Sequence, residues 1–323
     1  MCIERSFVNV NNLIFSLNAT MPVFLMMVLG YILKKINWID EEFASKINSF
    51  VFHVPLPVLV FNDLATVDFM EVWDTKFVVF CFLATLTSIL IAFVVSAIWK
   101  DKSIQGEFVQ ASYRSSAAIL GIAFIQNIYG NAGMGPLMVV ASVPLYNVAA
   151  VLILTLLGKE HKKMDKALLI KTLKGITTNP IIIGIVFGFT WSSFRIPMPY
   201  IMEKTVTNVA NIATPLGLMA MGAAFDWKKA FAKIKPAFIA VTIKLVGFVL
   251  IFLPIAIKMG FREEKIVALL VMLGSATTIS CYVMAKNMGH EGTLTSSVIM
   301  LTTLFCAFTL TGWLFVLRSI GLI

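Results

Sequence analysis

The most constraining feature of this sequence is a series of long apolar runs without charge, spread along nearly the whole chain. Hydrophobic residues make up 59% of the 323 positions and charged residues only 13%, which lies outside the range of soluble globular domains. A helix needs about 20 mostly apolar residues to cross a bilayer. The sequence therefore predicts an all-α integral membrane protein and excludes a soluble domain.

About ten membrane-spanning helices can be placed from these runs. The second segment is short and contains Pro55 and Pro57, and the fourth and fifth are separated only by the region around Gly130 and Gly135. The segments are 13–33, 47–61, 77–99, 108–128, 136–157, 176–194, 205–225, 236–257, 266–285 and 293–317.

The distribution of Lys and Arg orients these segments, because short cytoplasmic loops retain basic residues. With both termini extracytoplasmic, most of the 26 Lys and Arg residues, including Arg114, fall in inside connections. Asp63, Asp68, Glu71 and Asp74 then form an acidic connection on the opposite face. The net charge of +9 thus reports topology in the plasma membrane rather than a nucleic-acid partner.

An odd number of spans in each half predicts two repeats of opposite orientation. Residues 115–121 align with residues 274–280, and Gly130 and Gly133 align with Gly289 and Gly292. We expect a first repeat at 1–158, a basic cytoplasmic linker at 159–175 and a second repeat at 176–323.

Small and hydroxyl residues gather in the middle of the fourth and ninth segments. Such helices unwind easily, and the freed backbone groups are tolerated in a membrane only against protein or a wet cavity. The two half-helix N-termini would present partial positive charge to an anion. The alternative interpretation is that these small residues only allow close packing between helices. The candidate substrate-binding residues are Ser115, Ser116, Gly121, Gly274, Ser275, Thr277, Thr278 and Ser280.

Lys244 lies deep in the eighth segment, where an ionisable group is costly and needs a partner. It could neutralise the carbonyl ends of the unwound helices or attract a substrate carboxylate, and Asn147 is a candidate uncharged partner. The alternative is that its ammonium group reaches the membrane surface.

Several absences narrow the function. Segments three to five and eight to ten have no Asp or Glu in their interiors, which disfavours a cation-coupled antiporter. The chain has no Gly-x-Ser-x-Gly or His-Glu-x-x-His motif, so we expect no enzyme and no catalytic residues. The four cysteines lack metal-ligand spacing, and we expect neither a metal site nor a cofactor. We therefore expect a transporter, and a membrane-embedded ligand sensor is the main alternative.

The order of several short motifs resembles the auxin efflux carrier family in its bacterial branch. They are residues 179–184 (NPIIIG), 214–218 (TPLGL) leading to Gly222, 146–148 (YNV), and Ala285-Lys286 with Gly289. The resemblance covers nearly the whole chain. Ala117, Ala118 and Ala123 depart from the asparagine and proline that the family often has in the broken helices.

The resemblance implies two inverted five-helix repeats with broken crossing helices four and nine. Spans one, two, six and seven would form a scaffold, through which a homodimer could form, and the remaining spans a mobile unit that moves as an elevator. Relatives export auxin or carry dicarboxylates such as malate and malonate, so a small organic anion is the implied substrate. A lysine in the eighth span of related antiporters supports the crossing, a role that would suit Lys244. Substrate identity and the coupling ion, or its absence, stay open.

Overall fold

The computed structural model describes residues 21–22, 25–66, 73–130, 133–157 and 177–323, and these are helical with short connections and without strands. The predicted linker at 159–175 and the first half of the first segment lie outside these residues. The helices are residues 25–35, α2 (Glu41–His53), α3 (Pro55–Ala65), α4 (Thr75–Ser96), α5 (Gln105–Tyr113), η2 (Ala117–Gly121), α6 (Ile122–Tyr129), α7 (Gly135–Leu156), α9 (Pro180–Ser193), α10 (Tyr200–Ala223), α11 (Trp227–Ala232), α12 (Ile234–Thr242), η3 (Ile243–Gly247), α13 (Phe248–Lys258), α14 (Glu263–Gly274), α15 (Ser280–Asn287) and α16 (Thr293–Ser319), with a short 3-10 turn η1 (Lys102–Ile104) before α5.

Helix boundaries follow local capping chemistry. Asp74 accepts a hydrogen bond from the Phe77 amide at the start of α4, and Asn179 accepts one from the Ile181 amide at the start of α9. Pro55 occupies the first turn of α3, where a missing amide hydrogen costs nothing. The second apolar segment is therefore longer than predicted, since α2 and α3 join at Val54 and continue to Ala65.

Five helical stretches in the described part of the chain are long and apolar enough to cross a membrane. The ten-span arrangement stays a prediction, because the fourth and ninth segments are each divided into shorter helices and α9 has only 14 residues. The five stretches are Glu41–Ala65, Thr75–Ser96, Gly135–Leu156, Ile234–Lys258 and Thr293–Ser319.

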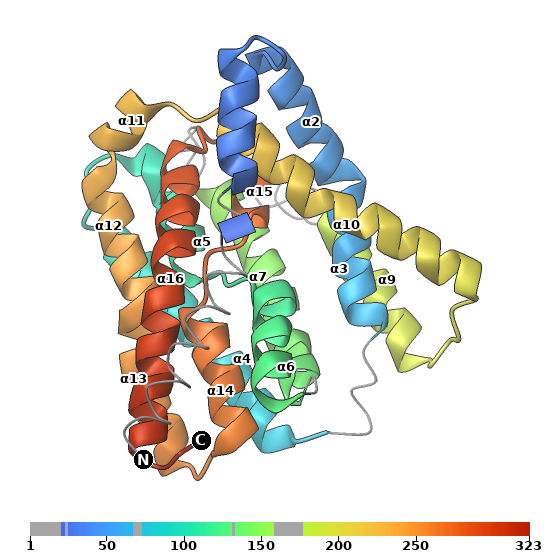
Figure 1. Ribbon diagram of the computed structural model, residues 1–323, viewed down its shortest axis with the longest axis vertical. Helices are drawn as coiled ribbons and strands as arrows, with labels where there is room; N and C mark the ends of the chain where they lie inside the picture. Colours follow the sequence, from blue (N-terminus) through green and yellow to red (C-terminus); the bar gives the residue numbers. More distant parts are fainter. Residues whose placement is uncertain (1–20, 23–24, 67–72, 131–132, 158–176) are drawn as a thin grey trace.

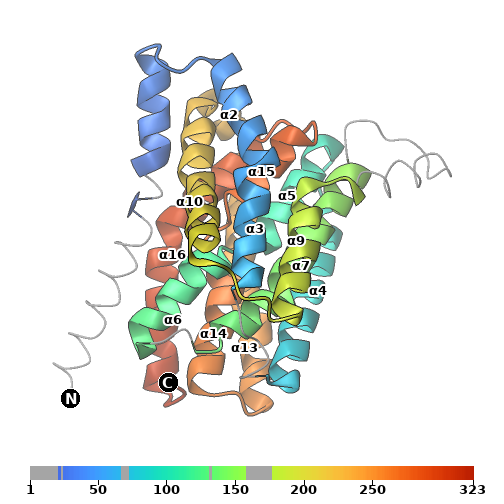
Figure 2. The ribbon, with the colours of Figure 1, turned by 90° about the vertical axis from the view of Figure 1, so that its right-hand side faces the viewer.

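The helices form two groups that meet along one boundary. The first, which we call the four-helix group, consists of α2, α3, α9 and α10, with α3 packed between α9 and α10 (Figures 1 and 2). The second, which we call the core group, contains α4 to α7 and α12 to α16, and α12, α13 and α16 lie on the side away from the first group (Figure 1).

A glycine pair fixes the closest contact inside the four-helix group. Gly184 and Gly188 stand one helical turn apart on α9 and face the backbone of α3. A Cβ atom on Gly184 would lie 2.5 Å from the Pro57 carbonyl oxygen, and one on Gly188 would lie 2.9 Å from the Phe61 carbonyl oxygen. Small residues at this spacing allow helix backbones to approach closely in membranes.

Replacing Gly184 with alanine should push α9 away from α3, because the added methyl group meets backbone rather than a flexible side chain. We expect Gly184→Ala to lower the free energy of unfolding by about 1–3 kcal/mol. Gly312→Ala on α16 is the matched control, since nothing lies within 4 Å of the added atom, and it should raise stability slightly. Thermal unfolding in detergent checks both variants, and equal melting temperatures would contradict the packing argument.

Candidate functional site at two helix interruptions

Two helices are interrupted side by side within the core group. The first leaves helical geometry after Tyr113, with Arg114 extended, and resumes at η2. The second ends at Gly274, with Ser275 extended, and resumes at α15. The Ser116 amide donates a hydrogen bond to the Ala276 carbonyl at 2.9 Å, so the two interruptions touch. Two helix C-termini and two helix starts therefore meet in one small region.

Lys244 binds the carbonyl ends at this meeting point. Its side chain is fully buried and lies in the π-helical stretch η3. Its ammonium group donates to the Leu273 carbonyl at 2.9 Å and the Tyr113 carbonyl at 3.3 Å, and it also contacts the Ser115 hydroxyl. These three acceptors match the three N–H donors of a lysine. Of the two roles left open by the sequence, this geometry favours neutralising the negative helix ends.

A small cavity of about 40 Å³ lies beside the interruptions, at the boundary between the two helix groups. It is large enough for ordered water. Four of the predicted binding residues line it, namely Ser115, Ser116, Thr278 and Ser280. The other lining residues are Leu59, Val60 and Asp63 from α3, Arg114, Ala117 and Ala118 from the first interruption, and Val143, Tyr146 and Asn147 from α7.

The other four predicted binding residues do not line this cavity. Thr277 is tied into the backbone, since its hydroxyl donates to the Ala111 carbonyl at 2.9 Å. Gly121 and Gly274 pack against neighbouring side chains, and a Cβ atom on Gly274 would lie only 2.8 Å from a methyl group of Val249. Ser275 is fully buried, and its hydroxyl has no hydrogen-bond partner within the described parts of the chain.

Arg114 is the residue at this site that the sequence analysis placed wrongly. The distribution of basic residues predicts a cytoplasmic loop at Arg114, but the residue lies in the first interruption and is only 2% exposed. One terminal nitrogen donates to Asn147 Oδ1 at 2.7 Å and the other contacts Met284 Sδ at 2.9 Å. Its Nε atom has no partner, and none of the ion pairs among the described residues involves Arg114. Asn147 thus contacts Arg114 rather than Lys244.

An unpaired guanidinium group in this position has a clear chemical consequence. Arginine keeps its charge in proteins, so Arg114 cannot reduce the free-energy cost of its burial by losing a proton. A buried charge without a partner is strongly destabilising. The planar fork of N–H donors matches a carboxylate, and Arg114 is therefore suited to hold an anion in the cavity.

Asp63 is the second charged residue that the sequence analysis misplaced. It was expected in an extracytoplasmic loop, but it lies in the last turns of α3 and lines the cavity. Its side chain is partly buried and forms no hydrogen bond or ion pair with the residues that the structure describes. The cavity thus has one cationic and one acidic lining residue, on different helix groups.

A larger basic vestibule of about 710 Å³ is lined by residues of 31–48 and 224–229 together with α15 and the start of α16. Five lysines line it together with three acidic residues, Glu41, Asp226 and Glu291. Helix α15 links the two spaces, because Ser280 at its start lines the cavity whereas Tyr282 and Lys286 line the vestibule. The lysines are Lys34, Lys35, Lys228, Lys229 and Lys286, all assigned to the cytoplasmic side by the sequence.

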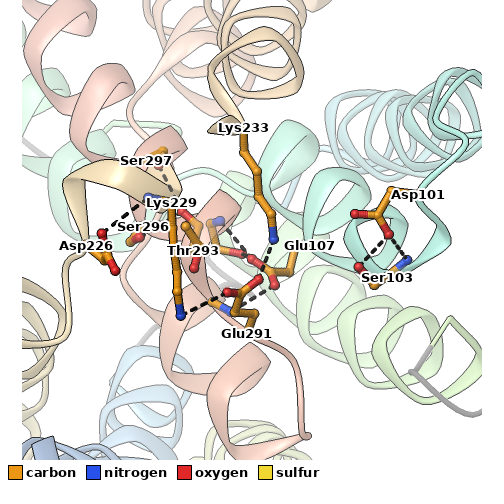
Figure 3. A network of polar contacts seen from close by, with 12 residues as sticks. Asp101, Ser103, Glu107, Asp226, Lys229, Lys233, Glu291, Thr293, Ser296 and Ser297 are labelled. Carbon is orange, nitrogen blue, oxygen red and sulfur yellow. Dashed lines mark hydrogen bonds and ion pairs between the residues drawn. The ribbon is translucent and has the colours of Figure 1, made fainter. Parts of the chain in front are cut away.

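A polar network lies beside the vestibule, and two of its members, Lys229 and Glu291, line it. Figure 3 shows Lys229 and Lys233 pointing toward Glu291, with distances of 3.4 Å and 2.5 Å between the charged atoms. Glu107, which is labelled in Figure 3, is buried and accepts hydrogen bonds from the amides of Gly292 and Thr295 at 2.8 Å and 3.0 Å. Glu107 therefore caps the N-terminus of α16.

No group of three or more His, Cys, Asp or Glu side chains within the described ranges could hold a metal ion. The interruptions instead bring together two buried cations, Arg114 and Lys244, several hydroxyl groups and two helix starts, which are groups able to bind an anion.

Comparison with known proteins assigns the chain to a family. The model of the family described as "Membrane transport protein" matches residues 15–314, nearly the whole sequence. The chain belongs to this membrane transport protein family. The resemblance to auxin efflux carriers inferred from short motifs is thereby confirmed. Membership in the membrane transport protein family points to transport rather than catalysis.

Two curated relatives align along most of the chain. The "Putative malonate transporter" of Rhizobium meliloti is 26% identical and covers 93% of this chain and 95% of its own length. An "Uncharacterized transporter" of Methanothermobacter thermautotrophicus is 21% identical and covers 94% of this chain and 98% of its own.

A solved structure has a related fold. The sodium proton antiporter MjNhaP1 from Methanocaldococcus jannaschii superposes with a TM-score of 0.60 at 13% identity, over 95% of this chain and 100% of that chain. At this identity the likeness concerns the fold.

Lys244→Met should destabilise the protein, because the carbonyl groups of Tyr113 and Leu273 would remain buried without a donor. Each unsatisfied group costs about 1–3 kcal/mol, so we expect a loss of unfolding free energy of a few kcal/mol. Lys235→Met on the same helix is the control, since Lys235 is exposed and its replacement should have little effect. Chemical unfolding in detergent measures both variants, and equal stability would refute the role of Lys244.

The ion pairs of Glu291 should make stability depend on pH. The hydrogen bond from Lys233 lowers the pKa of this carboxyl below its ordinary value. A lowered folded-state pKa contributes stability above the unfolded pKa, and this contribution is lost as pH falls through the folded pKa. Glu291→Gln should therefore lower the unfolding midpoint at neutral pH, and the difference from wild type should shrink in acid.

The control for this prediction is Glu42→Gln, because the Glu42–Lys46 pair is exposed and such pairs contribute little. Unfolding midpoints are compared between pH 7 and acidic pH. A Glu291→Gln effect that persists unchanged in acid would show that packing, not charge, is responsible.

Proposed function

We propose that this protein is a secondary transporter that moves a small organic anion of the auxin or malate and malonate type across the plasma membrane. Family membership supports the transport class, and the name of the Rhizobium meliloti relative supports a dicarboxylate. No cofactor is invoked in this mechanism. The single observation that carries the anion assignment is Arg114, a buried cation lining the cavity without a carboxylate partner among the described residues.

Within this proposal, Arg114 binds the substrate carboxylate, and Ser116, Thr278 and Ser280 supply hydroxyl groups to it. Lys244 and Ser115 hold the crossing together beneath the site. Gly121, Gly274, Ser275 and Thr277 are then positions that shape the interruptions by packing, and they do not contact the anion.

The proposed mechanism is alternating access by an elevator movement. The four-helix group acts as the scaffold, and the core group carries the site past it, within ten spans arranged as two inverted repeats. The location of the cavity at the boundary of the two groups supports this division. So does the occurrence of one interruption in each half of the chain, before η2 and before α15.

The proposed orientation, with both termini outside, determines the side of the membrane to which the vestibule opens. All five of its lysines belong to the predicted cytoplasmic set, so the vestibule would open to the cytoplasm and collect anions there. A homodimer through the scaffold stays a prediction. A membrane-embedded sensor is the remaining alternative, and a cation-coupled antiporter is less well supported because the cavity contains a fixed cation.

The test is counterflow in liposomes that contain the purified protein. A panel of labelled mono- and dicarboxylates that includes malonate is offered, and we expect saturable exchange of at least one member. Tight binding of a carboxylate without any counterflow would favour the sensor. If none of the panel binds or moves, the anion assignment fails.

Arg114→Gln should abolish this exchange and reduce malonate affinity by roughly 10- to 100-fold, the cost of losing a charged hydrogen bond. Without ligand the variant should be at least as stable as wild type, because it lacks the unpaired buried charge. The stabilisation that a given concentration of malonate provides should be smaller in the variant than in wild type, in line with its weaker binding. Arg262→Gln, an exposed arginine near the start of α14, is the control and should behave like wild type. An Arg114→Gln protein that still exchanges malonate would refute the assignment.

A further inference from the structure

Asp63 and Arg114 line the same cavity from the two sides of the boundary between the helix groups. Asp63 stands on α3 of the four-helix group, and Arg114 stands in the first interruption of the core group. Neither side chain forms an ion pair with the described residues, and no direct contact joins the two. A molecule in the cavity would therefore meet a cation and an acid at once.

Other charged groups are kept away from Asp63. The cavity lining contains one further ionisable side chain, Tyr146, which is neutral at ordinary pH. The donors of nearby Lys244 are already engaged by carbonyl groups and a hydroxyl. Helix α9 has no ionisable residue, and Asp68 and Glu71 lie outside the described ranges. The remaining ionisable groups on helices packed against α3 are exposed and do not line the cavity: Glu41, Glu42, Lys46 and His53 on α2, and Tyr200, Glu203 and Lys204 on α10.

This arrangement has a defined charge balance. In the empty cavity an ionised Asp63 and Arg114 give the lining a net charge of zero, although the two side chains form no ion pair. When a carboxylate binds Arg114, an ionised Asp63 would stand as a second negative charge in a poorly solvated space, and the two would repel. A protonated Asp63 would not repel the anion, and its hydroxyl could donate a hydrogen bond to it.

We propose that Asp63 is a proton-binding residue, so that an anion binding at Arg114 is accompanied by the uptake of one proton from solvent. This inference rests on the proposed function and deepens it, since it names the coupling ion at the binding step. Proton and anion then strengthen each other's binding by the same factor, because coupling between two sites is reciprocal.

The experiment is calorimetric titration of the purified full chain in detergent with malonate as the probe. Titrations in two buffers of different ionisation enthalpy at neutral pH give the number of protons taken up. We expect about one proton for the wild-type protein and about a tenfold loss of affinity for each pH unit above the range in which Asp63 titrates. The ionisation of malonate itself is common to all variants and cancels in their comparison.

Three variants isolate Asp63. Asp63→Asn is permanently uncharged and should bind malonate at neutral pH at least as tightly as wild type, without proton uptake. Asp63→Glu keeps an acid and should retain the uptake. Glu203→Gln removes an exposed acid on α10 and should match wild type.

The outcomes separate this inference from the proposed function. If wild type binds malonate without proton uptake, or if Asp63→Asn takes up as many protons as wild type, the inference is wrong and the proposed function stands. If wild type binds no carboxylate in the panel, both fail together. A wild-type protein that binds malonate without proton uptake overturns the inference even if a variant fails to fold.

Discussion

The contact of Lys244 with two helix ends is the interaction on which the rest of the site depends. Interrupting two helices inside an apolar protein leaves carbonyl groups that must be satisfied within the protein. One ammonium group satisfies Tyr113 and Leu273 together and also reaches Ser115, so both interruptions are held in one place. The cavity exists beside them because the chain leaves helical geometry there and later resumes it.

The two buried cations of this region have different surroundings and therefore different uses. Lys244 is surrounded by oxygen atoms of the protein, whereas Arg114 binds only an amide oxygen and a sulfur atom. A substrate anion could accept a hydrogen bond from the free Nε–H group of Arg114. Lys244 has no free N–H donor to offer it. Under the proposed function, this contrast lets Arg114 bind a negative charge at a site that has no metal-ligand cluster in its described surroundings.

Much of the helical architecture was predictable from hydropathy, because apolar length and helix length coincide for uninterrupted segments such as α7, expected at 136–157 and found at Gly135–Leu156. The small-residue clusters also lie where the chain leaves helical geometry, next to the extended residues Arg114 and Ser275. Arg114 and Asp63 were missed because each charge was interpreted as a loop residue, although Arg114 lies inside the segment predicted at 108–128 and Asp63 lies two residues beyond the one predicted at 47–61. Arg114 directly precedes the cluster at 115–121, and α3 continues beyond residue 61, the predicted end of the second segment, so that it includes Asp63. Their contacts depend on which helices pack together, and a single sequence does not specify that.

The central claim is that the core group carries an anion past a static four-helix group. Electron paramagnetic resonance distances test it most directly, with spin labels at exposed positions of the cysteine-free protein in liposomes. One pair joins Ile201 on α10 to Phe308 on α16, across the two groups, and a second pair joins Val94 on α4 to Phe308, within the core group. The account predicts that malonate shifts the distribution of distances between the labels at 201 and 308 and leaves the distances between the labels at 94 and 308 unchanged. A first distance that is identical with and without malonate, in a protein that exchanges malonate, would contradict it.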